Sequence, residues 1–213
     1  MITYLFDFDG TLVDSMPSWS SVMKRILDEF NVKYPVDLVS IITPLGIAKT
    51  ADYYIELGVP LSANEIVELM GKHMLDEYYY RIPAKENVVN VLKTLKNNGH
   101  SLNVLTASPH ITLNACLKRL GIWDLFSKVW SCDDFNTNKA DPEIYRSVAK
   151  KLNLFPEEII FFDDNCNACK TAKAAGMKVC GVYDDTSKNF VDDIKRVTDF
   201  YIYDFKELLD LNL

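Results

Sequence analysis

The sequence predicts an α/β protein: a doubly wound parallel sheet with a smaller all-helical domain inserted after the first strand. Two observations support this fold class. Short, continuously apolar runs alternate with helical patterns over residues 85–183, as in a parallel sheet covered on both faces. Residues 15–84 instead carry helical patterns and no convincing strand, and 70 residues are too many for a simple connection. We therefore expect a core domain of residues 1–14 and 85–213 and a helical cap domain of residues 15–84.

The first strand is expected over residues 2–8, ITYLFDF, which are mostly apolar, rich in strand-forming residues and followed by acid. Further runs of this kind predict strands at 101–106, 127–132, 158–163 and 177–183, with a late strand at 201–203. Parallel strands joined by helical crossovers form βαβ units, so these runs predict one sheet.

Helices are expected wherever apolar residues recur every three or four positions. In the insertion such patterns cover about residues 17–30, 47–57 and 62–80. In the core, three helical patterns stop at Gly99, Gly121 and Gly176, and Pro142 opens another helix, as Gly and Pro commonly do. A closing helix is expected over residues 204–211.

Composition excludes several classes of protein and partner. The apolar fraction of 48% and the charged fraction of 25% are those of an ordinary globular protein. The net charge of −7, without a run of Lys and Arg, argues against nucleic acid as a partner. No apolar stretch is long enough to span a membrane, and Asp7 and Asp9 interrupt the region where a signal peptide would be apolar. Five cysteines without framework spacing fit a reducing compartment, so a cytoplasmic location is expected.

Acidic side chains follow two of the predicted strands. Asp7 and Asp9 end the first strand, and Asp163-Asp164 end a later one. Ligands of open α/β sheets bind beyond the carboxyl ends of the strands, so these carboxylates should share one edge. Crowded carboxylates repel one another unless a cation enters. Mg²⁺ is the cellular default for one or two carboxylates plus a phosphate, and we therefore expect Mg²⁺ as the cofactor.

A phosphoryl group fits the remaining residues at this edge. Thr106 offers a hydroxyl beside exposed amides at the end of the second strand, and Lys139 offers a positive charge just before the Pro142 helix. Asp7 could then attack phosphorus and carry the phosphoryl group as an aspartyl phosphate. Asp9 would protonate the leaving oxygen and later deprotonate the attacking water.

Four motifs in this order resemble those of the haloacid dehalogenase-like hydrolase superfamily. The motifs are DFDGTLVDS at 7–15, LTAS at 105–108, KADPEIY at 139–145 and FFDDN at 161–165. One short acidic motif would be weak evidence, but four in order at strand ends are specific. The resemblance covers essentially the whole chain, including a helical cap placed as in members similar to phosphoglycolate phosphatase and β-phosphoglucomutase.

The resemblance implies a role for each matching residue. Asp7 would be the nucleophile and Asp9 the general acid and base. The metal would be held by the Asp7 carboxylate, the Asp9 carbonyl and Asp164, with Asp163 acting on it indirectly. Phosphoryl contacts would come from Thr106, Ala107 and Lys139, and Lys49 in the cap is a candidate for an anionic group of the substrate. Ala168 stands where many relatives carry a further acid.

Hydrolysis of a small phosphorylated metabolite is the function that these residues favour, by a monomer or a homodimer. A phosphosugar mutase is the alternative, although Trp19 stands where such mutases carry histidine. A receiver-like phospho-aspartate signalling switch is an alternative of another class. Dehalogenation is disfavoured because it does not need Asp9. Cys166 and Cys169 open a helix, where they form either a redox pair or, the favoured interpretation, two small residues packed against the sheet.

Overall fold

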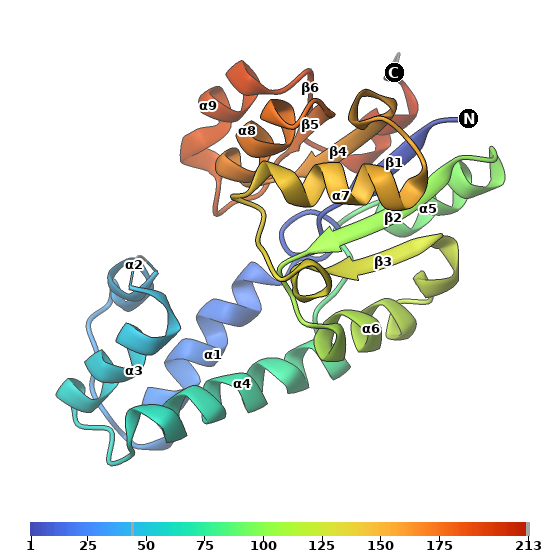
Figure 1. The fold of residues 1–213 in the computed structure, drawn as a ribbon. Coiled ribbons are helices and arrows are strands. Elements are labelled where there is room, and N and C mark those ends of the chain that lie inside the picture. The colour runs from blue at the N-terminus through green and yellow to red at the C-terminus, as the bar shows by residue number, and fades with distance from the viewer. Residues whose placement is uncertain (44, 212–213) are drawn as a thin grey trace. The chain divides into compact units, whose positions relative to one another are not determined.

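The computed structural model describes residues 1–43 and 45–211, which form two compact units (Figure 1). One unit combines Met1–Asp14 with Pro83–Leu213, and the other is Ser15–Ile82. The inserted unit thus ends at Ile82 rather than at residue 84. The reason is that residues 83–85 pair with the segment after the first strand: the Asp14 amide donates to the Pro83 carbonyl and the Lys85 amide to the Leu12 carbonyl, each at 3.0 Å.

The first unit contains a six-stranded, wholly parallel sheet in the order β3-β2-β1-β4-β5-β6. The strands are β1 Thr3–Phe6, β2 Ser101–Thr106, β3 Lys128–Ser131, β4 Ile159–Asp163, β5 Lys178–Val182 and β6 Phe200–Ile202. This is a doubly wound order, so the predicted α/β class and parallel sheet are confirmed. The chain adds strands on one side of β1 up to β3 and on the other side from β4 onwards, so the switch point, where such sheets bind ligands, lies between β1 and β4.

Helices cover both faces of this sheet (Figure 1). They are α5 Val88–Asn97, α6 His110–Arg119, α7 Pro142–Leu152, α8 Cys166–Ala174 and α9 Val191–Val197. On one face α7, α8 and α9 bury a core that includes Leu5, Phe161 and Val179. Neighbouring residues of the central strands point to the other face, where the rings of Phe6 and Phe162 lie 4.9 Å apart. Side chains on both faces of β1 are therefore buried, as its continuous apolar sequence predicts.

The second unit is helical throughout its secondary structure. It comprises α1 Met16–Glu29, α2 Leu38–Ile42, α3 Gly46–Leu57 and α4 Ala63–Tyr80. Ser62 begins α4 with a capping box, in which its hydroxyl accepts from the Glu65 amide. In the interior, Glu77 of α4 is paired with Arg25 of α1 and with Arg81. The short helix α2 was not predicted, because five residues show too little of a helical period. No described helix combines the length and apolar character that a bilayer crossing requires.

Candidate active site

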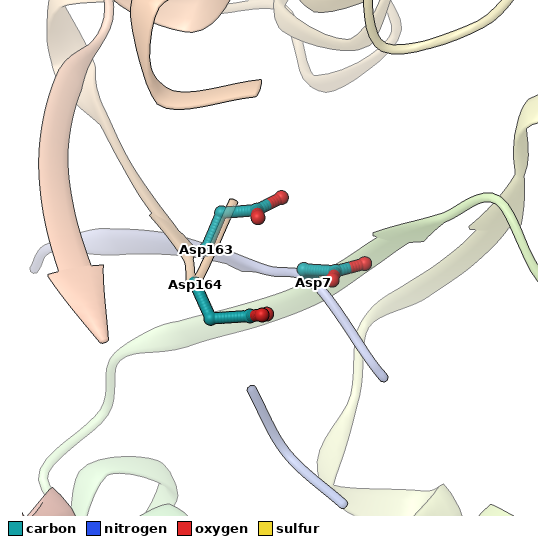
Figure 2. A group of neighbouring side chains, drawn as sticks. All are labelled: Asp7, Asp163 and Asp164. Atoms are coloured by element: carbon teal, nitrogen blue, oxygen red, sulfur yellow. The ribbon is translucent and has the colours of Figure 1, made fainter. Parts of the chain in front are cut away.

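Three carboxylates meet where β1 and β4 end (Figure 2). Asp7 follows β1, and its amide donates to the Phe162 carbonyl of β4 at 2.8 Å, which joins the two strand ends. Asp163 is the last residue of β4, and Asp164 follows it. One carboxylate oxygen from each residue lies within 4.8 Å of those of the others. The expected convergence of the acidic strand ends is therefore observed.

Lys139 supplies a cation from outside these strands. Its ammonium group forms ion pairs with Asp7 and with Asp163, the latter at 2.9 Å. The second oxygen of Asp163 accepts the Asn165 amide at 2.7 Å, so both oxygens of this carboxylate bind protein donors. Tyr145 of α7 donates its hydroxyl to the Lys139 carbonyl at 3.2 Å, which holds the loop that carries the lysine. Asp163 thus orients the ammonium group beside Asp7.

Burial and charge strongly affect the ionisation of the site. Burial raises the pKa of the Asp7 carboxyl well above its usual value, Asp163 and Asp164 add to this, and Lys139 opposes it. Burial likewise raises the pKa of Asp164 to about 7, with repulsion from Asp163 and Asp184 as further causes. Burial alone would lower the pKa of Lys139, but Asp163 and Asp7 together raise it well above the ordinary value. The lysine therefore stays protonated, whereas the carboxylates need a further positive charge to ionise together.

The residues at this edge fit a hard divalent cation. Three carboxylates and one ammonium group carry a formal charge of −3 + 1 = −2, which a dication balances. The donors are all oxygens, the ligands that Mg²⁺ prefers. Residues 9–13 form a turn, called the Gly10 turn below, which leaves room for these oxygen donors. Gly10 has φ +76°, and a Cβ atom there would lie 2.7 Å from both oxygens of Asp164. Thr11 in the same turn donates its hydroxyl to Asp164 at 3.1 Å.

Asp9 and Thr106 are linked through Ser108. The Ser108 hydroxyl donates to a carboxylate oxygen of Asp9, and its amide donates to the Thr106 hydroxyl oxygen at 3.0 Å. Because the Thr106 hydroxyl oxygen accepts from the Ser108 amide, the Thr106 hydroxyl proton points away from that amide. We did not assign a role to Ser108 from the sequence. Ser108 stands in the LTAS motif, but Asp9, the residue that it contacts, lies 99 residues away in the chain.

Two predicted ligand-binding residues are less engaged in these contacts. Ala107 is exposed after the end of β2. Lys49 is exposed on α3 of the second unit, and its role stays a prediction.

The cysteine pair at the start of α8 has the character of packed side chains. Cys169 is fully buried, and its thiol lies 3.5 Å from the Asp163 carbonyl. Burial raises the pKa of Cys169 well above the usual value, and the nearby Asp163 and Asp164 add to this. A thiol that resists ionisation is a poor nucleophile, which supports the structural interpretation over the redox one.

Comparisons with known proteins agree with this geometry. The family model described as haloacid dehalogenase-like hydrolase matches residues 4–182. The phosphoglycolate phosphatase of Salmonella choleraesuis (strain SC-B67) is 31% identical over 203 residues, covering 83% of this chain and 79% of that protein. A Thermotoga maritima protein named after β-phosphoglucomutase superposes with a TM-score of 0.86 at 23% identity, over 99% of this chain and 97% of that one. A Bacillus subtilis hydrolase, YfnB, solved bound to magnesium, superposes with a TM-score of 0.83 at 16% identity, over 98% and 97%.

Proposed function

Since the chain belongs to the haloacid dehalogenase-like hydrolase family and is a phosphatase, we propose that it hydrolyses small phosphomonoesters through an aspartyl phosphate on Asp7. The observation that carries this proposal is the meeting of Asp7, Asp164 and the Lys139 ammonium group at one strand edge. A carboxylate nucleophile, a cation site and a fixed positive charge are what transfer of a phosphoryl dianion requires.

In the first step an oxygen of Asp7 attacks phosphorus as the bond to the ester oxygen breaks. Asp9 gives its proton to the leaving oxygen, which departs as a neutral alcohol. In the second step water attacks the same phosphorus and gives a proton to Asp9. The bond to Asp7 then breaks, and inorganic phosphate is released. The hydrogen bond from Ser108 keeps the Asp9 side chain in one orientation for both proton transfers.

Lys139 and Thr106 orient the phosphoryl group. Two N–H bonds of Lys139 point to Asp7 and Asp163, and the third is available for a phosphoryl oxygen. The Thr106 hydroxyl and the backbone at Ala107 are the further donors that we propose for this group.

The Asp7 and Asp164 carboxylates and the Asp9 carbonyl are the groups that we propose would hold Mg²⁺, with Asp163 acting indirectly through Lys139. When bound, the ion would neutralise charge on the phosphoryl oxygens and favour ionised carboxylates.

The substrate class follows from the relatives and from the chemistry of the site. Relatives named phosphoglycolate phosphatase support a small phosphorylated metabolite, and Lys49 is our candidate for a second anionic group on it. Trp19 cannot supply the imidazole that the mutase alternative requires, so hydrolysis is favoured. The order β3-β2-β1-β4-β5-β6 also differs from the five-stranded 2-1-3-4-5 order of receiver domains, which disfavours the signalling alternative.

The test is turnover of p-nitrophenyl phosphate in MgCl₂ by purified Asp7→Asn protein. We expect activity to disappear, because an amide cannot form the acyl phosphate. Asp124→Asn, at an exposed aspartate in the turn before β3, serves as the matched control and should keep wild-type turnover. Full activity of the Asp7 variant would refute the assignment of the nucleophile. Stoichiometric labelling of the wild type by acetyl phosphate, without repeated release of phosphate, would support the signalling alternative instead.

A further inference from the structure

Lys85 reaches the proposed active site from the place where the chain re-enters the first unit. It lies three residues after Ile82, and its side chain is 19% exposed. Its ammonium group donates to the Gly10 carbonyl at 2.7 Å, to the Tyr183 carbonyl and to the Asp184 carboxylate at 3.1 Å. All three N–H bonds of the ammonium group thus have an acceptor within the protein. A largely buried lysine with this many contacts holds its neighbours in place rather than extending into solvent.

The contact with Gly10 lies in the turn that carries the catalytic groups. Asp9 precedes Gly10, and Thr11, which donates to Asp164, follows it. One side of Gly10 faces the Asp164 carboxylate, so closely that a Cβ atom would not fit. Its carbonyl is bound by Lys85. The Gly10 turn is therefore held between the proposed metal ligand and the lysine.

The other contacts of Lys85 give it a fixed anchor. Asp184 is buried beyond the end of β5, and one of its oxygens accepts from the Thr186 amide and hydroxyl at 2.9 and 2.6 Å. The other oxygen faces Lys85. In addition, the Lys85 amide donates to the Leu12 carbonyl. Residue 85 thus binds the Gly10 turn through both its backbone and its side chain, and links it to β5.

We propose that Lys85 is a positioning residue for phosphoryl transfer, acting through the Gly10 carbonyl to fix the Gly10 turn against Asp164. The inference rests on the proposed function, because it assigns this turn to the reaction. Loss of the ammonium group would leave substrate binding largely intact but would misplace Asp9 and Asp164. Errors of about 1 Å in such groups lower rates by about 100-fold, so kcat should fall by about 10- to 100-fold while KM changes little.

Three variants separate the positioning of the Gly10 turn from the effect of breaking the ion pair between Lys85 and Asp184. Lys85→Met removes the Gly10 contact and leaves Asp184 without its cation. Asp184→Asn keeps the lysine contacts with both carbonyls, and its remaining oxygen can still accept from Thr186. Lys85→Met combined with Asp184→Leu removes both charges. Lys93→Met, at an exposed lysine of α5, is the control for lysine removal.

We expect Lys85→Met and the double variant to lose kcat, while Asp184→Asn and Lys93→Met stay within about threefold of the wild type. The double variant should also regain urea resistance that Lys85→Met loses, yet remain catalytically impaired. Recovery of kcat in the double variant would overturn the inference, because the lysine would then serve only to balance Asp184.

Amide hydrogen exchange tests the same inference without turnover. The Gly10 amide donates to the Val13 carbonyl, and the Leu12 and Val13 amides donate to the Phe8 carbonyl. Peptides that cover residues 8–13 should exchange faster in Lys85→Met and in the double variant, and at the wild-type rate in Asp184→Asn. An inactive wild type would refute the proposed function, whereas unchanged exchange in Lys85→Met would refute the positioning role in either case.

Discussion

Replacing Gly10 by alanine separates backbone strain from damage to the proposed metal site. Gly10 has φ +76°, a conformation that costs a residue with a Cβ atom about 1–2 kcal/mol. Gly99, which ends α5, has φ +80° and nothing within 4 Å of the position that its Cβ would take. Gly99→Ala is therefore a control with the same strain and no contact. This backbone strain alone should cost each variant about 1–2 kcal/mol of unfolding free energy.

Only Gly10→Ala should damage the site. Its new Cβ would lie 2.7 Å from both oxygens of Asp164, whereas ordinary van der Waals contact begins at 3.4 Å. The carboxylate or the turn must therefore move by about 0.7 Å, since Cγ of Asp164 would also lie 2.8 Å from the new atom and turning the carboxylate about its Cβ–Cγ bond does not move Cγ. A displacement of this size near reacting atoms lowers kcat/KM by about 100-fold, or about 2.7 kcal/mol of transition-state stabilisation.

The assay combines urea unfolding, followed by tryptophan fluorescence, with p-nitrophenyl phosphate kinetics over a MgCl₂ titration. We expect Gly10→Ala to lose at least as much stability as Gly99→Ala, and we expect loss of activity and a higher Mg²⁺ midpoint in Gly10→Ala alone. If Gly10→Ala kept the turnover and the Mg²⁺ midpoint of Gly99→Ala, the close approach of Asp164 to this turn would have no role in the reaction.

Two further predictions concern ionisation. Because burial raises the pKa of Asp164 to about 7 from an ordinary 3.8, its contribution to the stability of the metal-free protein is full below 3.8 and is lost as the pH rises through 7. Mg²⁺ should thus raise the Tm more at pH 7.5 than at pH 5.5, in scans with MgCl₂ or EDTA, and equal shifts would contradict this. In the second unit, hydrogen bonds from Arg81 and Arg25 outweigh burial and lower the pKa of Glu77 below 4.5, so its stabilisation exists above that value and is lost as the pH falls. Glu77→Gln should cost about 1–3 kcal/mol at pH 7 in urea unfolding, a difference that should shrink towards pH 4.

Much of the fold could be predicted because its signals are local. The second strand was expected at residues 101–106 and is observed there. Helices expected to stop at Gly99, Gly121 and Gly176 do so, and each glycine has a positive φ that other residues rarely adopt. The first strand was expected over residues 2–8 but ends at Phe6. There the chain leaves the ladder for the Gly10 turn, which a run of apolar letters does not reveal.

The site was predictable where its residues end strands of the sheet or, as Lys139 does, stand in a motif of the sequence. Strand order brings Asp7 and Asp163 together, so the approach of these carboxylates follows from the α/β class once β1 and β4 are neighbours. Ser108 and Lys85 were not singled out, because their side chains contact partners that lie 99 and 75 residues away in the chain. Such contacts depend on the exact path of loops, which carry no periodic signal.

The division of charge between two lysines explains why Asp164 is suited to a metal. Lys139 binds Asp7 and Asp163, and Lys85 binds Asp184, one of the carboxylates that raise the pKa of Asp164. The hydrogen bond that Asp164 accepts comes instead from the neutral hydroxyl of Thr11. Since burial and the neighbouring carboxylates disfavour the ionised form of Asp164, and Thr11 adds no positive charge, an incoming cation is what would favour that form. Thr11→Val should weaken Mg²⁺ binding, because the Asp164 carboxylate would lose the hydrogen bond that orients it. Lys139→Met should remove turnover even in saturating Mg²⁺, because the metal does not replace the ammonium group beside Asp7.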